Sequence, residues 1–536
     1  MNPRIQVLPL RGSPLVEDYL AGRGAAPSFY RGRPRNPAAF RAKLEEVSGR
    51  FDRAARERAA AALRPTSAGA AERLRRFVEE GGAVVTTGQQ TGLFTGPLYT
   101  VHKILTAIRL AEELERELGV VVLPVFWSAS EDHDLDEVDH VDTVDRTRGG
   151  VVRLSVEHLD PRPLPMSDTS VGPNVEFVVS KFGQIVSQYG DVDKWITSIQ
   201  DAYRPSATMA GAFLDVVENL FSGFDLLLTD AADPALKAAS LPVLLGEAEH
   251  ARDHETLLMD TTERLERAGY DGQVAVLSDA ANLFWHGPRG RERLHRVDGG
   301  WEAREARRRF TDAELRAAIR ADPVAFSPNV FLRPVVESFV FPTLAYVAGP
   351  GEAAYFAQIG PLFEAFGIRM PIVFPRMSAV LVPEEADAAL AEAGLEIADL
   401  RPPMHEIAQR IARERVPAEM AEGFAALRSS IVAGYAGLMN DVAAVDPTLV
   451  NALGAERNRA LLGAGDAEQK VLRQIKRRDA GLLRRIEAAR AHLYPGGIPQ
   501  ERVLNVFPYL AAYGPNLLRD LAAQADVALE PAAVHA

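Results

Sequence analysis

The pattern of apolar and polar residues predicts a strand–loop–helix–strand unit over residues 82–140. Residues 83–87 form a short apolar run rich in β-branched side chains, and 120–127 form a second one. Both are typical of buried strands. A glycine-rich loop (88–96) lies between the first strand and a stretch of helical periodicity that Gly119 ends. Pro97 is expected at the first position of that helix.

Further apolar runs predict strands elsewhere in the chain. A long amphipathic stretch predicts a helix over 238–269, and the Arg-rich region 280–325 has the composition of a surface insertion. The expected strands cover residues 151–156, 224–229, 274–277 and 370–374.

Residues 384–494 change in character. Apolar residues from Met420 to Leu438 recur at steps of four and three, and the same pattern resumes after Asp446-Pro447. This predicts an antiparallel helical hairpin resembling a coiled coil. The narrow apolar stripe favours a homodimer contact, with packing against its own domain as the alternative.

The composition narrows the classes of function. The net charge of −13 over 536 residues argues against a protein that binds nucleic acid by neutralising phosphates. The absence of cysteine excludes disulfides and thiolate-ligated zinc. The N-terminus has no signal-peptide pattern, and no apolar run approaches the roughly 20 residues of a membrane span. We therefore expect a cytoplasmic protein without membrane contact.

Polar clusters follow both strands of the predicted unit. Residues 87–90 (Thr-Gly-Gln-Gln) follow the first strand, and 130–134 (Ser-Glu-Asp-His-Asp) follow the second. In such units ligands bind beyond the carboxyl ends of the strands, and the helix N-terminus suits an anion. The spacing fits neither a Walker A loop nor a dinucleotide fingerprint. His102 and Lys103 lie on the second turn of the helix, where a solvated helix face is the alternative.

The acidic cluster permits several interpretations. Glu131, Asp132, His133 and Asp134 could bind substrate, hold Mg²⁺ or Zn²⁺, or make structural hydrogen bonds. Four consecutive residues rarely converge on one ion, so we favour substrate binding and assign no metal. Later, Arg376-Met377-Ser378 follows an apolar strand. It is a loose analogue of the Lys-Met-Ser loop of class I aminoacyl-tRNA synthetases.

Six blocks of sequence together resemble the cysteine-adding enzymes of bacillithiol synthesis. The resemblance runs in order from about residue 80 to the C-terminus, strongly in the blocks and loosely between them. One departure is Glu337, where glutamine is expected. The blocks are TGQQTGLFTGPLYTVHK (87–103), PVFWSASEDHDLDEVDH (124–140), SPNVFLRP (327–334), AGPGEAAY (348–355), FPRMS (374–378) and YPGGIPQERVLN (494–505).

This resemblance implies a fold and a domain organisation. The fold is α/β, with a Rossmann-like parallel-sheet core, connecting insertions and an antiparallel coiled-coil arm that forms a homodimer. The implied division is a core over 1–383 with insertions at about 135–220 and 238–330, an arm over 384–494, and a returning segment over 495–536.

The implied activity joins cysteine to the amine of glucosaminyl-malate in an amide bond. We expect ATP with Mg²⁺ to activate the cysteine carboxylate. His102, Lys103 and Arg376 would offset phosphate charge, and Arg333 would bind the malyl carboxylate. The catalytic set is His102, Lys103, Glu131, Asp132 and His133; the substrate-binding set is Thr87, Gly88, Gln89, Gln90, Tyr99, Asp134, Asn329, Arg333 and Arg376.

Two alternatives remain open at this point. One is a non-catalytic or regulatory nucleotide-binding dimer, and the other is an amide-forming ligase that acts on another amine. Related enzymes that recognise cysteine through a cysteine-ligated zinc offer no template here, because this chain has no cysteine. We therefore expect no structural zinc.

Overall fold

The computed structural model describes residues 3–530 and divides the chain into two compact units. The first unit comprises residues 1–145, 152–380 and 501–536, and the second comprises 146–151 and 381–500. The sequence pattern placed the corresponding boundaries at 383/384 and 494/495.

The first unit is built on a six-stranded sheet with the order β14-β13-β3-β4-β7-β2. β14 (Ile372–Pro375), β13 (Thr343–Ala348), β3 (Gly82–Gln89), β4 (Val121–Ser128) and β7 (Leu227–Asp230) pair in parallel, and only the edge strand β2 (Arg64–Pro65) is antiparallel. The five parallel strands are almost wholly buried, as expected for a sheet covered on both faces. The α/β class of the core is thereby confirmed.

The strand order reverses between β3 and β13. From β3 the chain proceeds to β4 and β7 on one side, and it later returns to place β13 and β14 on the other. The carboxyl ends of β3 and β13 therefore flank a topological switch point, which is where open α/β sheets bind ligands. The residues after these two strands are Gln90 and Gly349.

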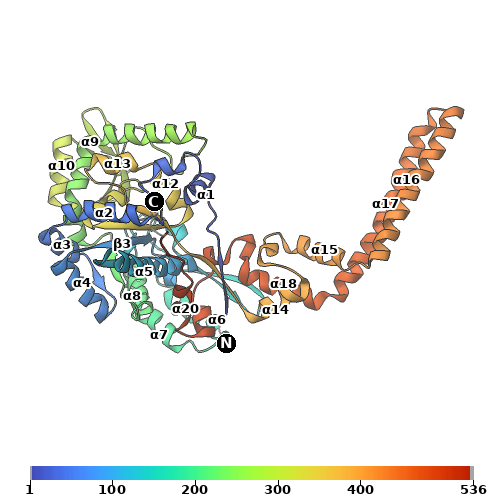
Figure 1. Cartoon of the computed structure of the whole chain (residues 1–536), viewed down its shortest axis with the longest axis horizontal. Helices are drawn as coiled ribbons and strands as arrows, with labels where there is room; N and C mark the ends of the chain where they lie inside the picture. Colours follow the sequence, from blue (N-terminus) through green and yellow to red (C-terminus); the bar gives the residue numbers. More distant parts are fainter. Residues whose placement is uncertain (1–2, 531–536) are drawn as a thin grey trace, which may run out of the picture. The chain divides into compact units, whose positions relative to one another are not determined.

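The predicted helix after β3 is α5 (Leu98–Leu118), and its C-cap is Gly119 in the left-handed conformation (φ 69°). Pro97 is the N-cap and lies outside the helix, because its ψ of 159° is extended. The preceding loop brings Gly92 and Gly96 together: a Cβ on Gly92 would lie 2.9 Å from the Cα of Gly96. α5 packs against β3 and β4 (Figure 1).

The Arg-rich region 280–325 is not a simple surface insertion. It folds into an antiparallel sheet with the order β11-β10-β9-β8-β12. Alternate residues of β9 carry arginine and glutamate, so the apolar signal that identifies a strand is weak there. Residues 274–277 form a loop rather than the expected strand. The strands are β8 (Ala280–Gly287), β9 (Gly290–Val297), β10 (Gly300–Ala303), β11 (Arg308–Phe310) and β12 (Phe326–Pro328).

Helices cover both faces of the core sheet (Figure 1). α2 and α3 are separate helices, because Asp52 caps a new helix at Arg53. The main helices of this unit are α1 (Pro14–Ala21), α2 (Pro37–Arg50), α3 (Arg53–Ala60), α4 (Ala68–Glu80), α6 (Val175–Val186), α7 (Asp193–Ala202), α8 (Met209–Leu220), α9 (Pro234–Arg267), α10 (Asp312–Ala321), α11 (Arg333–Val340), α12 (Pro350–Phe356), α13 (Gly360–Ala365), α19 (Phe507–Tyr513) and α20 (Leu517–Ala523).

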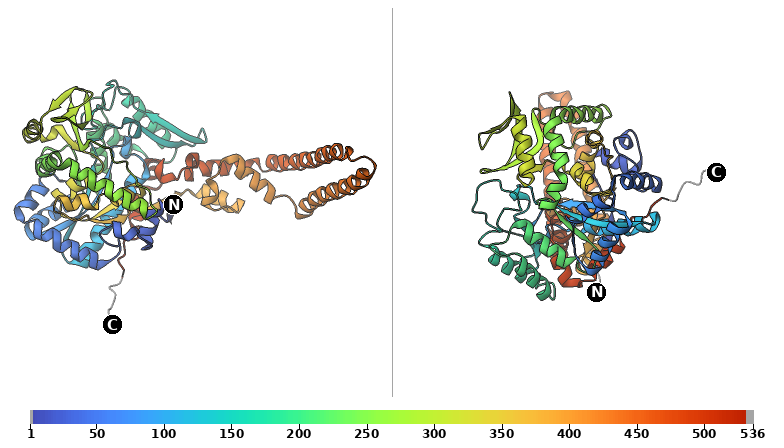
Figure 2. Two further views of the ribbon diagram at one scale, coloured as in Figure 1. Left: turned by 90° about the horizontal axis from the view of Figure 1, so that it is seen from above. Right: turned by 90° about the vertical axis from the view of Figure 1, so that its left-hand side faces the viewer.

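The second unit is helical. α16 (Ala418–Val445) and α17 (Leu449–Arg478) form the predicted antiparallel hairpin, which is drawn in orange and red in Figure 2. Arg428 on α16 forms an ion pair with Glu468 on α17. The other helices are α14 (Glu384–Ala393), α15 (Met404–Glu414) and α18 (Ala480–Leu493).

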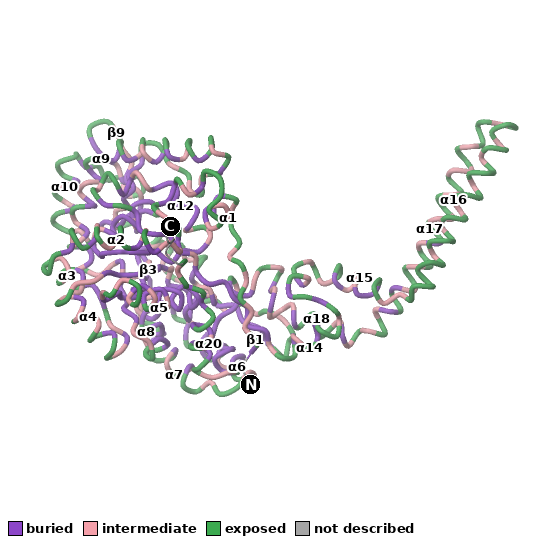
Figure 3. The backbone as a smooth tube through the Cα atoms, viewed as in Figure 1, coloured by how far each residue is buried: buried purple, intermediate pink, exposed green. Residues whose placement is uncertain are grey.

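Burial differs sharply between the core of the first unit and the long hairpin of the second. The core of the first unit is buried throughout, whereas the long hairpin is mostly exposed (Figure 3). α16 has no buried residue at all. Leu438 and Leu462 are 53% and 70% exposed, which is unusual for leucine. Among residues 3–530, no helix has both the length and the apolar character needed to cross a bilayer.

Candidate functional site

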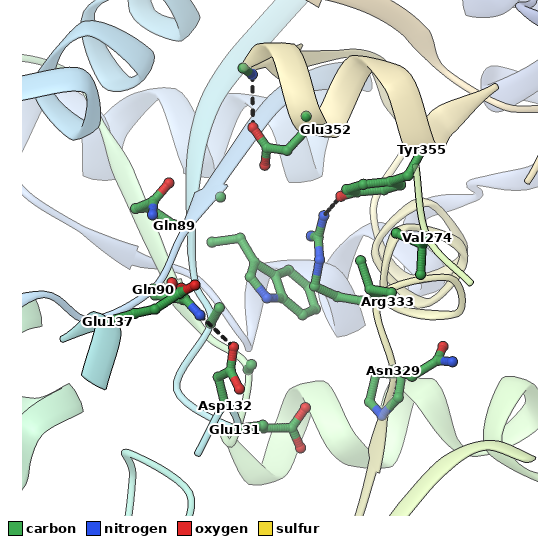
Figure 4. Close-up of a pocket in the computed structure, with 18 of the residues that line it drawn as sticks. Gln89, Gln90, Glu131, Asp132, Glu137, Val274, Asn329, Arg333, Glu352 and Tyr355 are labelled. Atoms are coloured by element: carbon green, nitrogen blue, oxygen red, sulfur yellow. Dashed lines mark hydrogen bonds between the residues drawn. The ribbon is translucent and has the colours of Figure 1, made fainter. Parts of the chain in front are cut away.

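A cavity of about 670 Å³ opens at the switch point of the core sheet, and all its lining residues belong to the first unit. Its walls come from the ends of β3, β4 and β13, from α5, α11 and α12, and from the β8–β9 hairpin. Gln90, Asp132 and Glu137 lie on one side, and Arg333, Tyr355 and Glu352 lie on another (Figure 4). The cavity is large enough for a small-molecule substrate.

Lys103 anchors the loop after β3. Its ammonium donates to the carbonyl of Gly88 (2.7 Å) and to the Gln89 side chain (2.9 Å), and it forms an ion pair with Glu352 (2.5 Å). These contacts use all three of its donors. Burial alone would raise the pKa of Glu352, but Lys103 outweighs this effect and the pKa is lowered. Lys103 therefore faces the cavity as half of an ion pair.

His102 lies beneath the cavity and does not line it. Its Nδ1 is 3.0 Å from Glu501, whose carboxylate also accepts two hydrogen bonds from Arg376 (2.7 and 2.9 Å) and one from Ser378 (3.1 Å). Burial would raise the pKa of Glu501, yet the hydrogen bonds of His102 and the charge of Arg376 hold it well below its usual value. This buried cluster ties the C-terminal segment to α5 and to the Arg-Met-Ser loop.

On the acidic side of the cavity, the side-chain amide of Gln90 contacts the carboxylates of both Asp132 and Glu137. The Gln90 side chain donates to Asp132 (2.6 Å) and is also hydrogen-bonded to Glu137. Glu137 is exposed, but its partial desolvation by the cavity wall raises its pKa, and the hydrogen bond from Gln90 partly offsets this rise. Asp132 lies 3.9 Å from the guanidinium group of Arg291 and 3.7 Å from Nδ1 of His133. This cluster suits an ammonium group or a general base.

His133 and Glu131 are already engaged by other side chains. Arg291 Nη1 lies 2.9 Å from His133 Nδ1, and because arginine only donates, Nδ1 must be the accepting nitrogen. Burial and the charge of Arg291 lower the pKa of His133. His133 is thus a neutral imidazole with its proton on Nε2. Glu131 forms a buried ion pair with Lys237, although burial still raises the pKa of Glu131.

Arg333 and Asn329 belong to the α11 wall. Arg333 donates to Glu337 (2.9 Å) and to the hydroxyls of Tyr346 (3.2 Å) and Tyr355 (3.1 Å). Glu337, the departure from the expected glutamine, is therefore what neutralises Arg333. The Asn329 side chain accepts hydrogen bonds from two backbone N–H groups just before α11, so it also fixes the start of that helix.

Comparison with known proteins identifies the chain's family. Residues 4–377 match the family model described as bacillithiol biosynthesis BshC, N-terminal Rossmann-like domain, and residues 379–529 match the BshC C-terminal coiled-coil domain. The chain belongs to the BshC family. This confirms the resemblance and the combination of a Rossmann-like domain with a coiled-coil domain.

Relatives of similar length carry the same description, "Putative cysteine ligase BshC". The chain is 32% identical to the protein of Koribacter versatilis over 515 residues, which cover 95% of the chain and 94% of the relative. It is 31% identical to that of Geobacillus thermodenitrificans over 521 residues, covering 95% of each. The protein of Salinibacter ruber is 33% identical over 439 residues, covering 82% of the chain and 80% of the relative.

The cavity gathers most of the residues that the sequence singled out. Three stand apart: His102 is buried beneath it, Thr87 donates to the carbonyl of Val347 inside the sheet (2.8 Å), and the exposed Asp134 is not part of the lining. The residues that do line it are Gly88, Gln89, Gln90, Tyr99, Lys103, Glu131, Asp132, His133, Asn329, Arg333 and Arg376.

Sequence reasoning missed several residues of this BshC cavity. Glu137 lay in the quoted block 124–140, and Glu352 in 348–355, so block membership was an available signal. Phe284, Arg291 and Arg293 lie on the β8–β9 hairpin, outside every block, and nothing in the sequence placed them here. Within residues 3–530, no group of three or more His, Cys, Asp or Glu side chains is arranged to hold a metal ion.

Proposed function

We propose that the protein joins cysteine to the amine of glucosaminyl-malate, after ATP-dependent activation of the cysteine carboxylate. The observation that carries the proposal is the division of charge in one cavity. Asp132 and Glu137 form an acidic side whose one ion pair among the described residues is the 3.9 Å contact between Asp132 and Arg291, while cationic side chains reach the remaining walls. An amide-forming ligase must bind ammonium, carboxylate and phosphate groups within one pocket.

In the first step a cysteine carboxylate oxygen attacks the α-phosphorus of ATP, and pyrophosphate leaves. Phosphate oxygens need donors and positive charge at this stage. Arg502 is exposed at the rim, and Arg376 lies over the Tyr99 ring (5.8 Å). Arg376 is held by Glu501, so it needs no reorganisation to meet the phosphate. Lys103, whose three donors are all used within the protein, fixes the loop after β3.

His102 takes a supporting role in this proposal. Its contact with Glu501 holds the carboxylate that in turn fixes Arg376 at the cavity wall. We therefore treat His102 as a positioning residue and not as a phosphate ligand. Substitutions of His102 should therefore change activity by changing the position of Arg376.

In the second step the acceptor amine attacks the activated carbonyl carbon. The new C–N bond replaces the C–O bond to phosphate, AMP leaves, and the attacking nitrogen gives up a proton. Glu137 is the preferred base, because its raised pKa strengthens a carboxylate that forms no ion pair with any residue of the described range 3–530. Asp132 would hold the cysteine ammonium. His133 donates through Nε2, since its Nδ1 lone pair is taken by Arg291.

Mass spectrometry of the complete reaction tests this proposal. Purified protein is incubated with glucosaminyl-malate, cysteine and ATP-Mg²⁺, with each component omitted in turn. We expect an amide product and AMP that appear only when all three are present. No product in the complete mixture, from folded protein, would favour a nucleotide-binding protein without catalysis. Product with other amino sugars but not with glucosaminyl-malate would favour a ligase for another amine.

We further propose that the hairpin α16–α17 forms a homodimer. The exposed leucines on both helices leave an apolar stripe uncovered within the described chain. A second copy of the same hairpin would cover it by side-by-side packing. Light scattering after size-exclusion chromatography should give twice the chain mass; a monomer at micromolar concentration would contradict this proposal.

A further inference from the structure

Six cationic side chains line the cavity, but they are not equally available to a ligand. Lys103, Arg333 and Arg376 each form an ion pair with a carboxylate at 2.5–2.9 Å. Their positive charge is therefore largely neutralised by carboxylates of the protein itself. The remaining three are Arg291, Arg293 and Arg502.

Arg291 and Arg293 stand together on β9. They are two residues apart, so they project from the same face of the strand, and both guanidinium groups lie over the ring of Phe284 (3.8 and 4.7 Å from its centroid). Phe284 is the direct partner of Arg293 on β8. A ring that contacts two guanidinium groups orients them without neutralising them.

Among the described residues, these two arginines have only one ion pair, the long contact between Arg291 and Asp132. Arg293 makes one hydrogen bond, to the carbonyl of Ala281 (3.3 Å), and among the described residues it forms no ion pair. Arg291 is buried and donates to Ser327 (2.9 Å) and to the carbonyl of Pro328 (3.2 Å), while Asp132 is 3.9 Å away. Burying a guanidinium group that has no close counter-ion or only a distant one is costly, and an anionic ligand would reduce that cost.

We infer that Arg291 and Arg293, held by Phe284, form the binding site for the carboxylates of the acceptor substrate. This inference rests on the proposed function, and it moves the malyl-carboxylate role from Arg333, whose charge Glu337 already pairs, to the β8–β9 hairpin. Planar guanidinium groups match carboxylates in bidentate geometry. Arg291 also contacts His133 and lies near Asp132, so a carboxylate bound here leaves the attached amine close to the acidic cluster.

ATP phosphate is the competing source of the same chemistry. The lining offers phosphate a different cation, because Arg502 lies near Tyr99, as does Arg376. Charge alone does not separate the two ligands. The experiment must therefore compare them on the same variant.

The variant Arg293→Gln tests the inference, with Arg289→Gln as the matched control. Arg289 lies in the turn of the same hairpin, is exposed, and does not line the cavity. Loss of one charge-assisted contact should raise the KM for glucosaminyl-malate about tenfold to a hundredfold. The KM values for ATP and cysteine should change less than about twofold, and Arg289→Gln should match the wild type. A rise confined to ATP, an equal rise for all substrates, or an equal effect of Arg289→Gln would overturn the inference.

A binding measurement on the wild-type protein keeps the test independent of turnover and of folding. Phenylglyoxal modifies accessible arginines, and peptide mass spectrometry reports which are modified. We expect malate to protect Arg293 and ATP-Mg²⁺ to leave it reactive; protection by ATP-Mg²⁺ alone would refute the assignment. If malate protects Arg293 but no amide product forms, the site stands and the proposed function fails. If product forms and the acceptor KM is unchanged in Arg293→Gln, the proposed function stands and the assignment of this site fails.

Discussion

Replacing Glu501 with glutamine should destabilise the first unit strongly. Its carboxylate accepts hydrogen bonds from Arg376 and Ser378 and is paired with His102, and all of these side chains are buried. Glutamine keeps the shape but removes the charge, which leaves Arg376 buried without a counter-ion. Breaking such a pair costs about 3–5 kcal/mol. The amide oxygen can still accept one hydrogen bond, so we expect about 3 kcal/mol.

Urea unfolding followed by tryptophan fluorescence measures this loss, because all four tryptophans lie in the first unit. Glu530→Gln is the matched control in the same C-terminal segment. Its partner is Arg33 at 3.1 Å, and both side chains are about half exposed. An exposed pair contributes about 0–1 kcal/mol, so this control should unfold nearly as the wild type does. A loss below about 1 kcal/mol in Glu501→Gln would refute the reasoning.

The same residue predicts a dependence on pH. The pKa of Glu501 is lowered in the folded protein, whereas an unfolded glutamate titrates near about 4.3. Between these values the unfolded chain binds more protons, so the stabilisation is complete above the unfolded pKa and declines as the pH falls below it. The wild type should therefore lose more stability than Glu501→Gln between about pH 5 and pH 3. Parallel losses in the two proteins would contradict the lowered pKa.

Three further outcomes are expected. Lys103→Met should lower kcat about a hundredfold by releasing the loop after β3, while Lys181→Met, an exposed control, should not. Glu137→Gln should lower kcat by about 10²-fold or more and abolish the rise of rate with pH through the raised pKa of Glu137. The control Asp136→Asn should retain the wild-type kcat and the rise of rate with pH. A rise of rate with pH that persists in Glu137→Gln would exclude Glu137 as the base. Leu438→Glu should convert a dimer to a monomer in light scattering, and an unchanged mass would exclude that face of α16 from the interface.

The local features of the fold were predictable because they depend on periodicity and turn chemistry. The buried runs at β3 and β4 and the Gly119 stop of α5 are local signals, and the structure follows them. The α16–α17 hairpin follows from its apolar spacing in the same way. The sheet β8–β12 escaped prediction, since arginines occupy inward positions where apolar residues are the expected signal.

The candidate site was predictable only as far as neighbouring residues specify it. Gln89, Gln90 and Asp132 lie at strand ends, where topology places ligands, and they do line the cavity. Which charges are already paired depends on partners far along the chain. Glu501 is 399 residues from His102, and no periodic pattern connects them. When Glu501 is not known to be its partner, the place of His102 in the sequence predicts a phosphate ligand and not a buried positioning residue.

An isotope-transfer measurement tests the central claim most directly. Cysteine labelled with ¹⁸O in its carboxylate is supplied with unlabelled ATP-Mg²⁺ and glucosaminyl-malate, and the nucleotide products are weighed by mass spectrometry. The account predicts one ¹⁸O atom in AMP for each amide formed, because the activated carboxylate oxygen leaves with the phosphate. Label in inorganic phosphate together with ADP, or amide formed with no label in any phosphate, would contradict it.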